Sequence, residues 1–119
     1  MFRPMQLAAA TALHIDESWH EEMNYNLYQK RRHLAEQILE TLQCTYNKSQ
    51  VGLFVWGRIS DHYQQVEDLT EAVLHKAHVF ITPGFIFGSN GARYIRISLC
   101  CDEQKLAEAL DRIKQNITE

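Results

Sequence analysis

The sequence has 119 residues, of which 45% are hydrophobic and 23% are charged, and we expect residues 1–119 to form a single domain with one core. The formal net charge of −3 argues against nucleic-acid binding, which requires a basic face. No apolar run approaches the ~20 residues of a membrane-spanning helix, so no membrane association is expected.

Two helices are predicted in the N-terminal third. Residues 5–14 are alanine-rich, and Pro4 suits the first turn of a helix. A longer helix is predicted over residues 18–42, where Ser18-x-x-Glu21 has the form of a capping box. Its apolar positions recur in steps of four and seven: Trp19, Met23, Leu27, Leu34, Ile38 and Leu42. Such a helix is ~37 Å long, so we expect it to contact more than this domain.

The middle of the chain alternates between predicted strands and helices. Residues 51–59, VGLFVWGRI, are apolar at both alternating sets of positions, which predicts a strand covered on both faces. A polar loop at 60–65 precedes a helix at 66–77. A brief strand is predicted at 78–82, ended by Pro83-Gly84.

The C-terminal third completes an α/β domain of α+β-like type. A loop rich in glycine occupies 83–91, a strand follows at 93–99, and a helix over 102–116 begins at the capping residue Asp102. The simplest packing of these elements is a three-stranded sheet against helices, with the long helix at the N-terminal side.

The strand at 93–99 places an arginine among polar neighbours. Alternation puts Ile95, Ile97 and Leu99 on one face, and Tyr94, Arg96 and Ser98 on the other. An arginine in mid-strand needs water, a carboxylate partner or an anionic ligand, because an unpaired buried charge is very costly. Two interpretations of Arg96 stay open. Its planar fork binds a substrate carboxylate through two parallel hydrogen bonds, or it is solvated or salt-bridged on an open sheet face.

The segment leading into this strand carries a specific motif. PGFIFGSNGARYIRISL reads P-G-x-x-F-G-x-x-G-x-x-Y-x-R-x-S and resembles the C-terminal segment of class I/II pyridoxal-phosphate aminotransferases, the aspartate aminotransferase superfamily of fold type I. The strand GLFVW resembles a strand of that family's small domain. The resemblance extends to the long helix, with its Arg31-Arg32-x-Leu34 pattern, and to the closing helix DEQKLAEALDRI. It covers residues 5 to 116.

The resemblance implies a role for Arg96. In the family, the matching arginine binds the α-carboxylate of the amino-acid or 2-oxo-acid substrate, and pyridoxal phosphate forms a Schiff base with a lysine of the large domain. None of the lysines here matches that lysine: Lys30, Lys48, Lys76, Lys105 and Lys114. The large domain and its phosphate-binding loop have no counterpart either. We therefore expect this chain alone to bind no cofactor and to be inactive, the activity belonging to a longer, homodimeric parent.

Two alternatives to a role as the C-terminal small domain stay open. One is a free-standing module that binds a small carboxylate through Arg96 without a cofactor. The other is an interaction protein that completes a separately encoded large domain. An apolar surface facing the missing large domain is also expected. It would be formed by Phe85, Ile86 and Phe87 and by part of the helix at 5–14.

The remaining candidate groups are expected to be structural. The six histidines lack zinc-like spacing, so no metal site is expected. Three cysteines, an odd number, favour a reducing cytoplasm over a disulfide framework. We expect Cys44, Cys100 and Cys101 to be small buried hydrophobes. The aromatic side chains expected to pack rather than to stack on a ligand are Trp19, Tyr28, Phe54 and Trp56.

Overall fold

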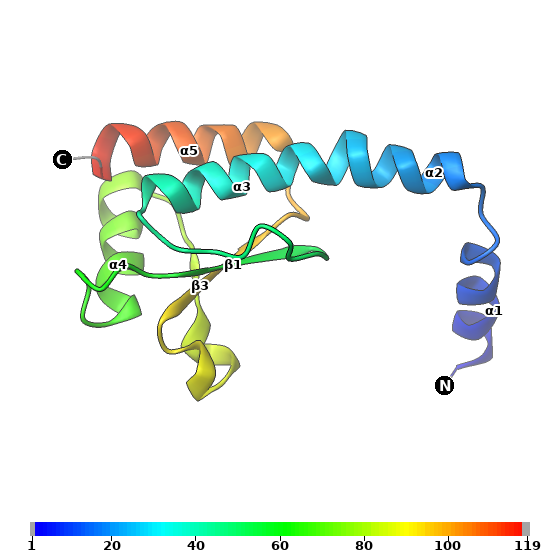
Figure 1. The fold of residues 1–119 in the computed structure, drawn as a ribbon, viewed down its shortest axis with the longest axis horizontal. Helices are drawn as coiled ribbons and strands as arrows, with labels where there is room; N and C mark the ends of the chain where they lie inside the picture. The colour runs from blue at the N-terminus through cyan, green and yellow to red at the C-terminus, as the bar shows by residue number, and fades with distance from the viewer. Residues whose placement is uncertain (1, 118–119) are drawn as a thin grey trace.

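The fold is a small antiparallel sheet covered on one face by helices. The computed structural model describes residues 2–117. The sheet has the order β1-β3-β2, with β1 at Phe54–Arg58, β3 at Tyr94–Ser98 and β2 at Thr82–Pro83. Helices α3 (Gln29–Thr41) and α5 (Glu103–Ile117) lie side by side above it, and α4 (Val66–Ala77) packs at one end (Figure 1). The predicted α/β domain with a three-stranded sheet is confirmed.

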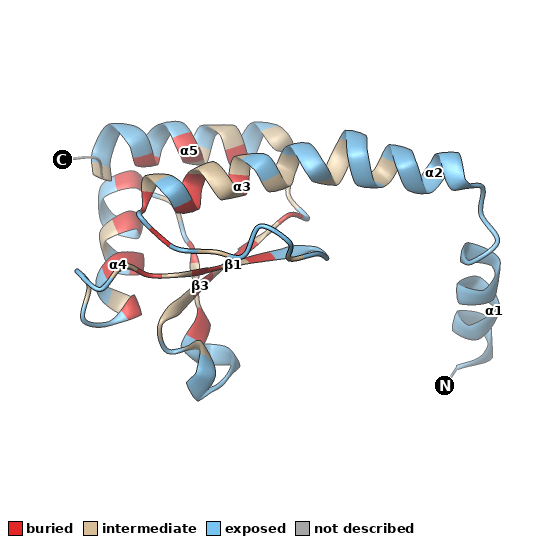
Figure 2. Cartoon of the chain, in the orientation of Figure 1, coloured by how far each residue is buried: buried red, intermediate tan, exposed pale blue. Residues whose placement is uncertain are grey.

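The core lies between the helices and one face of the sheet. Alternation along β3 buries Ile95 and Ile97, and β1 contributes Val55 to the same face. The helices meet this face with apolar residues at helical spacing, such as Leu106, Leu110 and Ile113 on α5. Figure 2 shows these buried positions gathered where α3, α4 and α5 face the sheet.

The long N-terminal helix is a continuous rod with an irregular middle. It comprises α2 (Glu17–Glu21), the π-helical segment η1 (Glu22–Tyr28) and α3, which matches the predicted extent of 18–42 (Figure 1). The predicted capping box is wrong, because the N-cap lies two residues before Ser18. Asp16 is the cap, and its carboxylate accepts a hydrogen bond from the Ser18 amide at 3.4 Å. The π-helical segment was not predicted.

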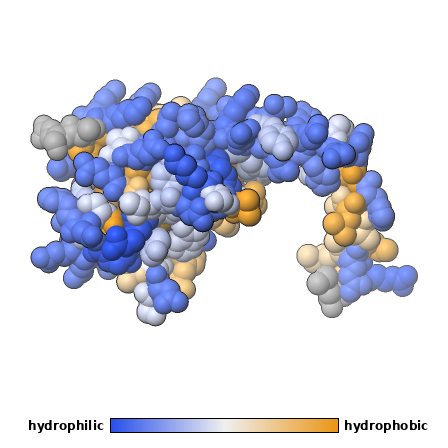
Figure 3. All heavy atoms as spheres, viewed as in Figure 1, coloured by the Kyte–Doolittle hydropathy of each residue, from blue (hydrophilic) through white to orange (hydrophobic). Residues whose placement is uncertain are grey.

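The N-terminal part of the molecule stands away from the core. Helix α1 (Arg3–Ala12) is joined to the outer end of the rod, and no residue of α1, α2 or η1 is buried (Figure 2). Figure 3 shows apolar atoms gathered on α1. The rod therefore extends past the sheet, and the expectation that it contacts more than this domain stays a prediction. No helix within residues 2–117 has the length and apolar character to cross a membrane.

The predicted strands at 51–59 and 78–82 need correction. Strand β1 is shorter than predicted, and helices cover only its Val55 face, so the prediction of two covered faces is wrong. Pairing of β2 starts only at Thr82, where the prediction had the strand ending. The cause is His78, which ends α4 in the left-handed conformation (φ 54°) and redirects the chain. Phe80 is consequently 71% exposed.

The turns around β3 are set by local hydrogen bonds. Asp102 caps α5 as predicted, since its side chain accepts from the Lys105 amide at 2.9 Å. Helix α4 has a reciprocal capping box between Gln65 and Asp68. The loop at 83–91 folds into two 3-10 turns, η2 (Gly84–Phe87) and η3 (Ser89–Gly91).

Candidate functional site

Arg96 lies at the centre of the face that the helices leave uncovered. Strand register places it opposite Trp56 of β1 on one side and opposite Thr82 of β2 on the other. Because paired residues in a sheet point to the same side, these three side chains share one face. The predicted assignment of Arg96 to the face opposite Ile95 and Ile97 is confirmed by their burial.

Three aromatic rings surround the Arg96 guanidinium. Its Cζ atom lies 4.1 Å from the ring centroid of Phe54 and 4.0 Å from that of Phe87. The Trp56 ring is further away, at 6.0 Å. These are cation–π distances, and the negative ring faces favour the positive charge. Phe54 and Trp56 were expected to pack within the protein rather than to stack on a ligand. They pack on the guanidinium at the uncovered face, and Phe54 is 39% exposed.

The guanidinium of Arg96 has no acid partner within residues 2–117, whereas other arginines at the sheet are engaged. Arg93 donates hydrogen bonds to the carbonyl oxygens of Tyr63, Gln64 and Ser60 and pairs with Asp61 at 3.1 Å. Arg58 also pairs with Asp61, at 3.0 Å. Arg31 and Arg32 donate to backbone carbonyls. Among the described residues, the side chain of Arg96 makes no such hydrogen bond, so its donors are available to a ligand.

The glycine-rich loop positions Phe87 against this arginine. Gly84 and Gly91 approach so closely that a Cβ on Gly84 would lie 2.6 Å from the Gly91 oxygen and 2.7 Å from the Tyr94 oxygen. Only glycine fits this contact, which holds η2 against η3. Phe87 at the end of η2 then meets Trp56 edge to face, with centroids 5.5 Å apart. The motif P-G-x-x-F-G-x-x-G thus has a direct structural basis.

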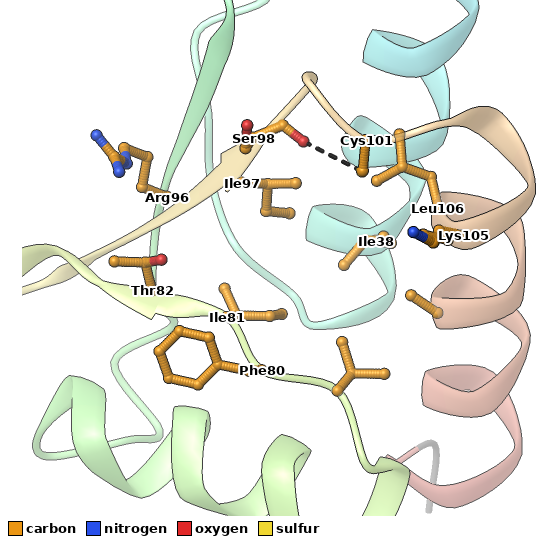
Figure 4. A pocket seen from close by; sticks show the side chains of 12 residues that line it. Ile38, Phe80, Ile81, Thr82, Arg96, Ile97, Ser98, Cys101, Lys105 and Leu106 are labelled. Atoms are coloured by element: carbon orange, nitrogen blue, oxygen red, sulfur yellow. Dashed lines mark hydrogen bonds between the residues drawn. The ribbon is translucent and has the colours of Figure 1, made fainter.

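Several hollows adjoin this region, and two of them lie next to Phe87 or Arg96. One, of about 410 Å³, lies on the uncovered face and is lined by Trp56, Phe87, Asn90, Gly91 and Tyr94. The other, of about 220 Å³, is mostly apolar and lies between β3, residues 79–82 and α5. Arg96 borders the second hollow, but Figure 4 shows its side chain directed away from Ile97 and Leu106. The Arg96 guanidinium therefore lies on the uncovered face of the sheet and not inside the second hollow.

The cysteines divide between core and surface. Cys44 is buried as predicted, and burial raises the pKa of its thiol to about 12, which keeps it protonated. Cys100 is exposed, which corrects the expectation of burial, because it follows the end of β3 on the outward side of the turn. Cys101 is half-buried. Among the residues that the structure describes, no three histidine, cysteine or acidic side chains gather as metal ligands.

The fold and the site define a domain with an unpaired arginine on an open sheet face, and known proteins identify its family. The profile of the family "Aminotransferase class I and II" matches residues 2–113. The chain belongs to this family, as its motif predicts.

Several characterised aminotransferases are similar over nearly the whole chain. Transaminase BacF of Bacillus subtilis is 34% identical over 97% of this chain and 29% of its own length. Aromatic-amino-acid aminotransferase 2 of Thermococcus litoralis is 33% identical over 97% of the chain and 30% of its length. The solved aromatic aminotransferase of Pyrococcus horikoshii superposes with a TM-score of 0.73 at 34% identity, over 92% of this chain and 30% of its own. The chain thus spans about 30% of these relatives.

The described residues do not fit the family's cofactor. One solved relative, an aminotransferase of Clostridium difficile, has pyridoxal phosphate bound. A Schiff-base lysine needs a covered pocket that lowers its pKa, yet all five lysines here are exposed. None of them lines the hollow beside Trp56 and Phe87. Lys105 borders the same hollow as Arg96 but lies across it and is 3.9 Å from the Asp102 carboxylate. No step through the cofactor is therefore assigned to these residues.

Proposed function

We propose that this chain is the C-terminal small domain of a pyridoxal-phosphate-dependent amino-acid aminotransferase and that Arg96 binds the substrate α-carboxylate. The observation that carries this proposal is the Arg96 guanidinium itself, which faces the uncovered side of the sheet with no acid partner within residues 2–117. A substrate carboxylate would supply the missing partner through two charge-assisted hydrogen bonds.

The chemistry assigned to this chain is binding and orientation. A bidentate contact fixes the plane of the carboxylate and hence the direction of the bonds at the neighbouring carbon. The cofactor and its lysine would come from the other 70% or so of an aminotransferase, in line with the 29% of Transaminase BacF that this chain matches. The domain without that part is expected to bind carboxylates weakly and to catalyse no transamination.

The first test measures binding by the chain itself. Backbone amide signals in ¹H–¹⁵N NMR spectra of wild type and variants, together with the Arg96 Nε–Hε signal of the wild type, are followed during titration with pyruvate against sodium chloride of equal ionic strength. We expect a saturable shift that Arg96→Gln abolishes. Arg112→Gln is the matched control, because Arg112 pairs with Glu108 on the outer surface of α5. A titration unaffected by Arg96→Gln would contradict the proposal.

The second test asks whether the domain functions within an aminotransferase. The matching 29% of Transaminase BacF is replaced by this chain, and transamination is measured. Arg96→Ala in the chimera should raise KM for every α-carboxylate substrate. It should also lower kcat/KM by an amount equivalent to a loss of on the order of 2–4 kcal/mol of transition-state stabilisation, which is the value of a charged bidentate contact. Unchanged kinetics would remove Arg96 from the site. Pyruvate binding by the chain combined with an inactive but folded chimera would favour the cofactor-free binding module.

A further inference from the structure

We propose that Phe54 and Phe87 are positioning residues for Arg96: they restrict its guanidinium so that the hydrogen-bonding edge is presented to a carboxylate in one orientation. This inference rests on the proposed function, since it takes Arg96 as the carboxylate-binding residue. It adds two residues, from separate segments, whose part in the site is to act through Arg96.

Two rings from separate segments of the chain contact the guanidinium. Each centroid lies about as close to Cζ as stacking allows, at 4.1 Å for Phe54 and 4.0 Å for Phe87. No ring contact joins Phe54 to Phe87 in the described structure, so the rings are not stacked on each other at one face of the cation. Aromatic rings accept none of the N–H groups in conventional hydrogen bonds, so the donors stay available for an anion.

The fold places both aromatic residues beside the arginine. The register opposite Ser98 in the β1–β3 ladder sets the backbone position of Phe54. Phe87 is held by the contact between Gly84 and Gly91 and by its edge-to-face packing on Trp56 at 5.5 Å. The clamp proposed here is therefore already assembled in the structure.

The clamp has an energetic consequence for binding. An arginine on an open surface samples many rotamers and loses that freedom when it grips a ligand, which opposes binding. Contacts that already restrict the side chain reduce this loss. Removing one ring should therefore weaken carboxylate binding without abolishing it, whereas removing the guanidinium should abolish it.

The experiment uses the 119-residue chain and two NMR readouts of the Arg96 Nε–Hε group: its ring-current shift in the free protein and its dissociation constant for pyruvate. Phe87→Leu and Phe54→Leu keep the bulk of the side chain but remove the ring. Phe87→Tyr restores a ring. Phe85→Leu is the matched control, because Phe85 lies in the same 3-10 turn and is not among the rings that contact Arg96 in the described part of the chain.

We expect Phe87→Leu and Phe54→Leu each to reduce the ring-current shift and to raise the pyruvate dissociation constant about three- to tenfold, in line with one cation–π contact. Phe87→Tyr and Phe85→Leu should stay close to wild type. Backbone amide spectra establish that each variant is folded, and the two rings give independent tests if one variant is not.

The failures of the two proposals are distinguishable. If wild type binds pyruvate through Arg96 and the leucine variants bind equally well, the clamp is wrong and the carboxylate site stands. If wild type itself shows no pyruvate-dependent shift at Arg96, the carboxylate site is wrong and the clamp falls with it. A wild-type Arg96 signal without any ring-current shift also overturns the clamp.

Discussion

A methyl group at Gly91 should disrupt the loop that carries Phe87. A Cβ built on Gly91 would lie 2.5 Å from the carbonyl carbon of Gly84 and closer still to its oxygen. Both neighbours are backbone atoms, so no side-chain rotation relieves the clash, and η2 must move away from η3. Overpacking of this kind costs ~1–3 kcal/mol, and the backbone contact places Gly91→Ala towards the upper end.

Calorimetry and NMR together measure this effect. At ~4 °C per kcal/mol, the Tm of Gly91→Ala should fall by ~4–12 °C. The Arg96 Nε–Hε signal should move as well, because Phe87 is displaced with η2. Ser89→Ala is the control: it lies in the same loop, is exposed, and should change Tm little. An unchanged Tm and Arg96 signal in Gly91→Ala would refute the reasoning that the glycine pair holds Phe87 in place.

Three further predictions concern the scaffold. Arg93→Gln removes the hydrogen bonds from Arg93 to the loop at 60–64 and should lower the free energy of unfolding in urea by ~1.5–3 kcal/mol. The surface variant Arg112→Gln is the control and should change it by less than ~0.5 kcal/mol. Burial raises the pKa of Cys44 from 9.0 to about 12, so the buried thiol stabilises the folded state fully below pH 9 and progressively less as the pH rises towards 12. Relative to Cys44→Ala, the wild-type free energy of unfolding should fall by up to ~1.4 kcal/mol per pH unit between these two values. Deleting residues 2–15 should leave thermal stability unchanged, since no residue of α1 is buried, and should reduce binding of an apolar dye; a large loss of Tm would contradict it.

The regular elements were predictable because their signals are local. Helix α4 occupies 66–77 as predicted, since its apolar positions recur with helical period. Alternation along 93–99 likewise assigned Arg96 to the polar face of β3. The strand at 78–82 was misplaced because nothing in the sequence marks His78 as left-handed; glycine or asparagine would have been the usual signal there.

The surroundings of Arg96 could not be read from the sequence. The contact with Phe54 depends on the register between β1 and β3, two strands that lie far apart in the sequence. Apolar residues at alternate positions give the same pattern whether a helix or a guanidinium covers them, so the strand was predicted to be covered on both faces. The glycines of the motif were a usable signal for Phe87, because a pair of glycines flanking two turns often marks close backbone contact.

Arg31 and Arg32 of the long helix connect the rod to the strands around Arg96. They follow the π-helical segment η1: Arg31 donates to the Leu99 carbonyl at 3.0 Å, and Arg32 donates to the Gly52 carbonyl at 2.6 Å. Leu99 comes directly after β3, and Gly52 comes two residues before β1, so both bonds tie the rod to the strands that carry Arg96 and Phe54. These two bonds thereby fix the direction in which α2 and η1 extend relative to the Arg96 guanidinium. In a longer aminotransferase, a part of the protein that packs on the exposed faces of α1, α2 and η1 would take a defined position relative to Arg96. A carboxylate bound by Arg96 could then be aligned with reactive groups supplied from outside this chain.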